Sequence, residues 1–197
     1  MRKKIGLYDP FYEHDACGVG FVANLDGTKS HEIVEEGITV LRNLEHRGAI
    51  GGDQKTGDGA GMLMQIPHRL FARDVGSDVP GPGEYCVGFF FLPQDSEQLV
   101  SAKSLVEGQI ERRNGKLVGW RAVPTLPDCL GEFARSTMPS FWQAVITLGE
   151  ISGDELERQA YILRKCIERE AVSQGFELDD FYVTSLSSRT ITYKGMF

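Results

Sequence analysis

The stretch Cys17-Gly-Val-Gly-Phe-Val-Ala23 opens the regular part of the sequence and is the first of the apolar runs that decide the fold. Its β-branched and aromatic residues predict a strand, which the turn sequence Asn24-Leu-Asp-Gly27 would end. Ser30 is the predicted N-cap of a helix, since the apolar residues after it recur at helical spacing. We expect Gly48 to cap the end of this helix.

The rest of the sequence supplies further strands and helices, and their order indicates the fold class. Strands are predicted over residues 62–66, 85–92, 116–123, 142–148, 181–187 and 190–197, and helices over 95–110 and 154–174, with a short helical turn after Pro67. Neighbouring strands joined by turns pair antiparallel, so the sequence predicts an α+β fold with helices on the outer faces. A doubly wound parallel sheet fits less well, because strict alternation of strand and helix is missing. The last run reaches Phe197 without a polar tail, and we expect a domain that is incomplete at its C-terminus.

The composition excludes several classes of protein. The 197 residues include 21 Lys and Arg against 28 Asp and Glu, a formal net charge of −7, whereas nucleic-acid contacts need clustered basic residues. No apolar stretch approaches the roughly 20 residues of a membrane-spanning helix. The basic start Met1–Lys4 is followed by Asp9 and Pro10 where a signal peptide would be apolar. We therefore expect a cytoplasmic protein that binds neither nucleic acid nor membrane.

The cysteines favour the same compartment. Cys17, Cys86, Cys129 and Cys166 lack the paired spacing of zinc ligands, and their scatter does not indicate a disulfide framework. We predict no metal site, and we expect the last three of these cysteines to be small core residues.

Cys17 is the first candidate for chemistry. A lone cysteine at the start of a strand is typical of a small buried hydrophobe. The alternative is a thiolate nucleophile, which needs a nearby base. If the Ala16–Cys17 bond were cut, the new α-amino group, with a pKa near 8, would lie within reach of its own thiol and act as that base. In this interpretation residues 1–16 are a propeptide.

Two further stretches are candidates for a binding site. Leu44-Glu-His-Arg-Gly48 is either a plain helix end or a helix end that carries Arg47 into a cleft, where it binds a carboxylate or orients neighbouring groups. Six glycines fall between Gly48 and Gly61, but the stretch Thr56–Gly61 lacks the Lys-Ser/Thr of a phosphate-binding loop. It is therefore either a flexible hairpin or a loop that lines a cleft, where glycines let the backbone approach a ligand.

Taken together, CGVGF, LEHRG and KTGDGAG, in this order, resemble the N-terminal amidotransferase domain of glutamate synthases, a class II (N-terminal-nucleophile) glutamine amidotransferase. The leader YDPFYEHDAC is similar to the propeptide and cleavage junction of that family. The resemblance covers essentially the whole chain and is strongest over residues 8–65. It implies a four-layer αββα sandwich of the N-terminal-nucleophile hydrolase type, with two stacked antiparallel sheets. It also implies that residues 1–16 are a propeptide and that residues 17–197 are the first part of a glutaminase domain.

The resemblance also implies a reaction. Cys17, freed at the Ala16–Cys17 junction, takes the place of the nucleophile that attacks the amide of L-glutamine, with its own α-amine as base and acid. Arg47 matches the arginine beside the nucleophile in that family. The remaining matches are to the loops of the site: Gly18, Gly48 and Asp58.

Other parts of the family's machinery lie further along than this chain reaches. They are an Arg-Tyr-Ser segment, a His-Asn-Gly-Glu motif that forms the oxyanion hole, and a later aspartate. The Asn114-Gly115 pair of this chain is instead predicted to be a turn after a helix. The resemblance implies that ammonia passes to 2-oxoglutarate at a synthase site outside this chain. The remainder of the large chain, with its electron-donor subunit, would carry FMN and an iron–sulfur cluster, and this segment would carry no cofactor.

Two alternatives remain open. The chain could be a truncated, catalytically inactive structural fragment, or a stand-alone amidotransferase subunit that serves another acceptor. The fragment would be stable only when paired with other segments, and the stand-alone subunit would differ from a glutamate synthase only after Phe197.

Overall fold

The fold is taken from a computed structural model, which describes residues 18–44, 59–177 and 180–196. The elements in chain order are α1 (His31–Asn43), β1 (Gly59–Gln65), α2 (His68–Val75), β2 (Cys86–Leu92), α3 (Ser96–Glu111), β3 (Lys116–Ala122), the 3-10 helix η3 (Pro127–Cys129), α4 (Glu132–Ser136), β4 (Ser140–Thr147), α5 (Gly153–Ser173), β5 (Tyr182–Ser187) and β6 (Thr190–Met196). The predicted α+β class is confirmed.

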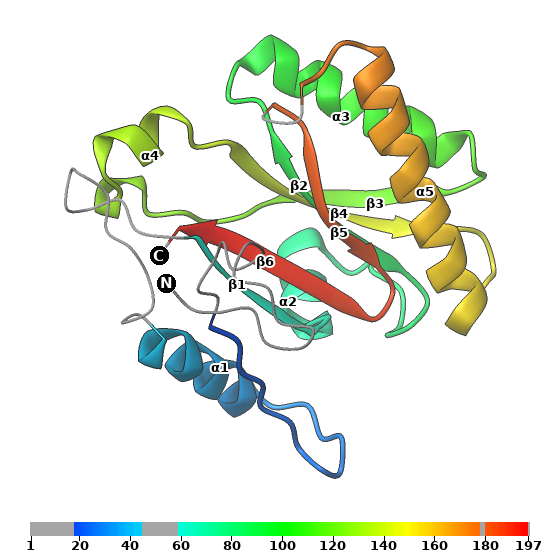
Figure 1. The fold of residues 1–197 in the computed structure, drawn as a ribbon. Helices are drawn as coiled ribbons and strands as arrows, with labels where there is room; N and C mark the ends of the chain where they lie inside the picture. Colours follow the sequence, from blue (N-terminus) through cyan, green and yellow to red (C-terminus); the bar gives the residue numbers. More distant parts are fainter. Residues whose placement is uncertain (1–17, 45–58, 178–179, 197) are drawn as a thin grey trace, which may run out of the picture.

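The described strands form two antiparallel sheets (Figure 1). The larger sheet has the order β3-β4-β2-β5, and the smaller sheet pairs β1 with β6 from Gly59↔Met196 to Gln65↔Thr190. The turn between β5 and β6 carries the chain directly from the larger sheet to the smaller one. The first residues of β1 are the last residues of the Thr56–Gly61 motif, and β1 pairs with β6. The turn therefore links the larger sheet, through β6, to the strand that contains the end of this motif.

Helices α3 and α5 cover one face of the larger sheet (Figure 1). The stripe predicted for α5 is fully buried there: Leu156, Ala160, Leu163, Ile167 and Ala171. These side chains pack with Phe90 and Ile146 of the sheet in one continuous core. Burying each leucine or isoleucine of such a stripe stabilises the fold by about 1.5–3 kcal/mol.

The opposite face of the larger sheet packs against the smaller sheet and α2. Phe71 of α2, Phe89 of β2 and Ile191 of β6 are all buried in this second core. The rings of Phe89 and Tyr193 of β6 lie 5.3 Å apart, which joins the two sheets directly. The smaller sheet is thus stacked on the larger one.

Helix α1 lies next to β1 of the smaller sheet, at the end of the molecule opposite to α3 and α5 (Figure 1). Its contact with β1 is made at Gly37, where an added Cβ would stand 3.0 Å from Cε of Met62. None of the residues of α1 is buried, although its predicted apolar stripe is present.

Two local predictions at the N-terminal end are wrong. Of the predicted strand 17–23, the described residues 18–23 form no strand, and Val19 and Phe21 are 89% and 92% exposed. A strand needs a partner for its backbone groups, and this segment instead packs with its glycines against α1. The helix also ends before Gly48: its last residue is Asn43, and Leu44 is the C-cap.

The other boundaries agree with the sequence to within a few residues. Ser30 is the N-cap of α1 and accepts a hydrogen bond from the backbone N–H of Ile33, and Asp95 caps α3 by accepting from Glu97 and Gln98. The short helices η3 and α4 were not predicted, because three to five residues are too few to show a helical period.

Candidate functional site

The segment that follows Cys17 is held against α1 by two glycines. A Cβ on Gly18 would lie 2.8 Å from Cδ2 of Leu44, and a Cβ on Gly20 would lie 2.5 Å from Cγ1 of Val40. Both distances are shorter than those of ordinary Cβ contacts, so a larger residue at either position would require the side chain of Leu44 or Val40, or the segment itself, to shift. The backbone therefore runs along the last turns of α1.

The contact between Gly18 and Leu44 brings the CGVGF motif next to the first residue of the LEHRG motif. Gly18 follows Cys17 directly, and Leu44 is the first residue of the LEHRG motif. Of the predicted site residues only Gly18 is described, and it is exposed at the end of α1. Ala16, Cys17, Arg47, Gly48 and Asp58 lie outside the described residues.

The third motif enters the structure through β1. Gly59 follows Asp58 and pairs with Met196, and a Cβ added to Gly61 would lie 2.6 Å from the backbone oxygen of Tyr193. A backbone atom cannot move aside as a side chain can, so Gly61 is required for β1 to lie this close to β6. At Gly59 the corresponding distance, to the oxygen of Gly195, is an ordinary 3.6 Å.

The three motif edges therefore form one connected unit, which we call the motif half: residues 18–44, β1 and β6. Gly18 and Gly20 join the first segment to α1, Gly37 joins α1 to β1, and Gly61 allows β1 to pair with β6. Sequence reasoning missed the roles of Gly20 and Gly37. The sequence pattern that could have indicated the contact is the alternation of glycine with Val19 and Phe21. In an extended segment this alternation places Gly18 and Gly20, which have no side chain, on the same side.

The described histidines are engaged in local contacts. Nδ1 of His68 lies 3.2 Å from the hydroxyl of Tyr85, and burial raises the pKa of that hydroxyl to about 12. Nε2 of His31 lies 3.7 Å from the Glu35 carboxylate on the exposed face of α1. Neither arrangement is that of a base aimed at a nucleophile.

The described cysteines are free thiols with different surroundings. Cys86 is fully buried, as predicted, and burial together with the charge of Glu157 raises the pKa of its thiol to about 12, so it remains protonated. Cys166 is half-buried on α5, with Nη1 of Arg113 3.6 Å from its sulfur. The core prediction is wrong for Cys129, which ends the short helix η3 and is exposed.

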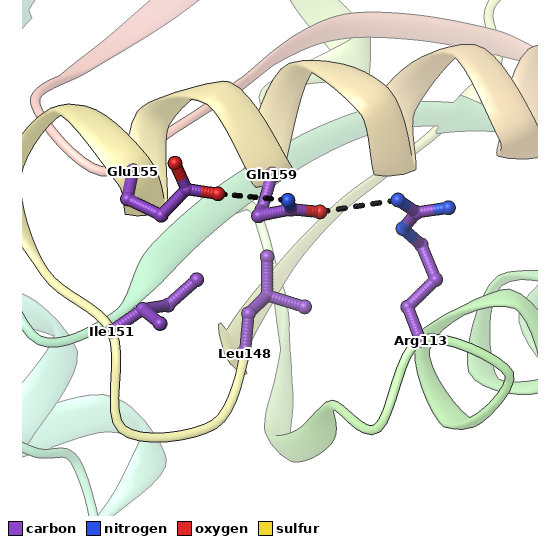
Figure 2. A pocket seen from close by; sticks show the side chains of 5 residues that line it. All are labelled: Arg113, Leu148, Ile151, Glu155 and Gln159. Atoms are coloured by element: carbon purple, nitrogen blue, oxygen red, sulfur yellow. Dashed lines mark hydrogen bonds between the residues drawn. The ribbon is translucent and has the colours of Figure 1, made fainter.

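A pocket of about 190 Å³ opens between the end of α3 and the start of α5 (Figure 2). Arg113 donates to Gln159 at 3.1 Å, and Gln159 donates to Glu155 at 2.9 Å, above an apolar floor of Leu148 and Ile151. The pocket lies in the outer helical layer, and none of these five lining residues belongs to a motif. The adjacent Asn114-Gly115 pair is a turn, as predicted: Asn114 has a φ of 54°, and Gly115 donates to the oxygen of Ile110.

Metal-binding clusters and membrane-spanning helices are both missing from the described part of the chain. Within residues 18–44, 59–177 and 180–196, no group of three or more His, Cys, Asp or Glu side chains is placed to hold a metal ion. Among the helices described, none is both long and apolar enough to cross a bilayer.

Comparison with known proteins identifies similar chains. Residues 17–197 match the family of class-II glutamine amidotransferases. The NADPH glutamate synthase large chain of Bacillus subtilis (strain 168) is 39% identical over 199 residues, which cover 100% of this chain and 13% of the relative. The chloroplastic ferredoxin-dependent glutamate synthase of Spinacia oleracea is 42% identical over 200 residues, which cover 99% of this chain and 12% of the relative. The NADH glutamate synthase of Saccharomyces cerevisiae is 40% identical over 206 residues, or 98% of this chain and 9% of the relative.

Proposed function

Because this chain belongs to the class-II glutamine amidotransferases, we propose that it supplies the glutamine-hydrolysing site of a glutamate synthase. Residues 1–16 are a propeptide in this proposal, and residues 17–197 are the first part of the glutaminase domain. The match to the family begins at residue 17, which supports this division. The chain spans only 13% and 12% of the bacterial and plant relatives, so the remaining activity belongs to other parts of such a protein.

The proposed reaction starts at Cys17. Hydrolysis of the Ala16–Cys17 bond frees an α-amine, which takes the proton of the Cys17 thiol. The thiolate attacks the side-chain amide carbon of L-glutamine, and the amine returns the proton to the leaving nitrogen, which departs as ammonia. Water, deprotonated by the same amine, then cleaves the γ-glutamyl thioester, and glutamate and the free thiol are released.

The other predicted site residues have positioning and binding roles in this proposal. Arg47 binds a carboxylate or orients the groups beside the nucleophile, and Gly48 and Asp58 belong to the loops around it. Gly18 leaves room for the nucleophile to lie at the end of α1. The observation that carries this arrangement is the close approach of Gly18 to Leu44, which joins the flank of Cys17 to the first residue of LEHRG.

The rest of the protein would use the ammonia. We assign its transfer to 2-oxoglutarate, a reductive step, to a synthase site outside this chain that carries FMN and an iron–sulfur cluster. The relatives are named for NADPH, ferredoxin and NADH, so they do not select one electron donor. The proposed compartment is the cytoplasm, where a free thiol nucleophile stays reduced.

Replacement of Cys17 by alanine in the full-length protein tests the proposal. We expect glutamine-dependent glutamate formation to fall to background, because the nucleophile is lost, while ammonia-dependent formation is retained. C166A is the matched control, since it removes a half-buried thiol on α5 that belongs to none of the motifs, and it should keep both activities. Glutamine turnover that survives C17A would show that another residue is the nucleophile.

A further inference from the structure

Two acidic residues of α5 contact the joint between the two sheets: Asp154 forms an exposed ion pair with Arg189, and Glu157 makes the partly buried contact. Glu157 lies on the face of α5 that meets the turn Ser187–Thr190, which carries the chain from β5 to β6. The residue is partly buried at this joint and lies outside all of the sequence motifs.

The Glu157 carboxylate accepts hydrogen bonds from three donors of this turn. The Ser187 hydroxyl lies 2.8 and 3.1 Å from its two oxygens, and the backbone N–H and hydroxyl of Ser188 each donate to it at 2.7 Å. Ser187 Oγ in turn accepts from the backbone N–H groups of Arg189 and Thr190, at 3.0 and 3.2 Å. The backbone N–H groups of Ser188, Arg189 and Thr190 therefore all donate either to Glu157 or to Ser187, which is itself hydrogen-bonded to Glu157.

The charge of Glu157 is maintained at this site. Burial alone would raise the pKa of its carboxyl group, but the hydrogen bonds from Ser188 and Ser187 and the charge of Arg189 outweigh burial and lower the pKa. Hydrogen bonds to an ionised acceptor are about twice as strong as neutral ones, so the turn is pinned firmly to α5.

The pinned turn determines where the smaller sheet lies. Ile66, which follows β1, donates to the oxygen of Arg189 at 3.2 Å, and Thr192 of β6 donates to Oγ of Ser185 in β5 at 3.1 Å. From Thr190 onward β6 pairs with β1 along its whole length. A shift of the turn would therefore move β6 and β1 together.

Further contacts connect the turn, through β6 and β1, to α1 and to the segment that begins at Gly18. Gly61 of β1 lies against β6 so closely that an added Cβ would stand 2.6 Å from the backbone oxygen of Tyr193, and Met62 contacts α1 at Gly37. Helix α1 in turn holds the segment that begins at Gly18. We propose that Glu157 is a positioning residue for glutamine hydrolysis: by pinning the β5–β6 turn it fixes the motif half over the larger sheet. This inference rests on the function proposed above.

The test compares three variants in the full-length protein. E157A removes the acceptor, and E157Q keeps an oxygen for the Ser188 N–H while the serine hydroxyls rotate to meet its amide. E168Q is the matched control, because Glu168 also lies on α5 and accepts two charge-assisted hydrogen bonds, but from Arg164 and Lys165 of the same helix. Steady-state glutamine hydrolysis, the thermal midpoint and hydrogen exchange of residues 189–195 are measured for each.

We expect E157A to lower kcat by about 10- to 100-fold, the effect of a displacement of about 1 Å at a reacting centre. The KM for glutamine should change less, and exchange of residues 189–195 should accelerate. E157Q should recover most of kcat, and E168Q should match the wild type in kcat and exchange. A role in stability alone would lower the thermal midpoint of E157A without changing kcat per folded molecule.

The outcomes separate this inference from the proposed function. If the wild type hydrolyses glutamine in a Cys17-dependent manner and E157A does so at the wild-type kcat, the positioning role is overturned alone. Unchanged exchange of residues 189–195 in E157A overturns it as well. If the wild type shows no Cys17-dependent hydrolysis, the proposed function fails, and the positioning role fails with it.

Discussion

Helices α1 and α5 have similar apolar stripes but very different surroundings. Five residues of α5 are buried between the larger sheet and α3, whereas α1 buries none of its described residues. The helix half, made of α3, α5 and the four-stranded sheet, is stabilised by a continuous core. In the motif half, β1 and β6 share the second core with the larger sheet, whereas residues 18–44 are held by close contacts at Gly18, Gly20 and Gly37. The described edges of the three motifs therefore lie in the less buried part of the described chain.

This difference has a physical basis. A two-stranded sheet is at best marginally stable by itself and needs packing on a face. Here the inner face of β1 and β6 is packed, but on the outer face Leu63 is 65% exposed. Segments that bind ligands are commonly drawn from the low-stability part of a protein. We expect mutations to affect the two halves unequally.

The largest expected difference is between core truncations in the two helices. Leu163 of α5 is fully buried and Ile38 of α1 is 40% exposed. L163A should lower the free energy of unfolding by about 2–5 kcal/mol, since it leaves a cavity in the larger core, while I38A should cost less than about 1 kcal/mol. Denaturant unfolding of the chain measures both values. Equal losses for the two variants would contradict the contrast between the helices.

A smaller effect is expected within β1. In G61A the new methyl group meets the backbone oxygen of Tyr193 at 2.6 Å, so the β1–β6 pair must open, and we expect a loss of about 1–3 kcal/mol. G59A is the control, because its methyl group has an ordinary 3.6 Å contact and should change stability by less than about 0.5 kcal/mol. Hydrogen exchange of Met62 to Gln65 should accelerate in G61A alone. Faster exchange in G59A would show that the strand itself, and not the contact at Gly61, is sensitive.

The smallest effect is an acid-sensitive loss of stability. Hydrogen bonds from Arg73 and Arg121 lower the pKa of Asp74 to about 2, and the pKa of Glu157 is lowered as well. Because both folded-state values lie below those of the unfolded chain, these carboxylates stabilise the fold above about pH 4, and this contribution is lost as pH falls toward 2. Denaturant midpoints of the wild type and D74N should therefore differ at neutral pH and converge as pH falls toward the folded-state pKa of Asp74. A constant difference across this range would contradict the assignment.

The helix half could be predicted closely from the sequence. Five in-step apolar residues of α5 predict both the helix and its buried face, and Asp95 marks the start of α3. These features depend on neighbouring residues in the sequence, so a helical period or a capping residue is sufficient to predict them. The family was likewise correctly identified from three short motifs, since their order is more specific than any one of them.

The motif half could be predicted only in part. The segment after Cys17 has the composition of a strand, but a strand also needs a partner, and the glycines at positions 18 and 20 place it on α1. No sequence pattern indicated Glu157 either, because its hydrogen bonds come from Ser187 and Ser188, far along the chain. Contacts of this kind depend on tertiary structure and leave no local pattern.

Glutamine chemistry that starts at Cys17 as a new N-terminus is the central claim. The most direct test treats the full-length protein, purified from its native source, with a glutamine analogue that carries an electrophilic carbon in place of the amide. Peptide mass spectrometry then locates both the N-terminus and the label. We predict a first peptide that begins at Cys17 and carries the label on that residue. A first peptide that retains residues 1–16, or a label on another residue, would contradict the claim.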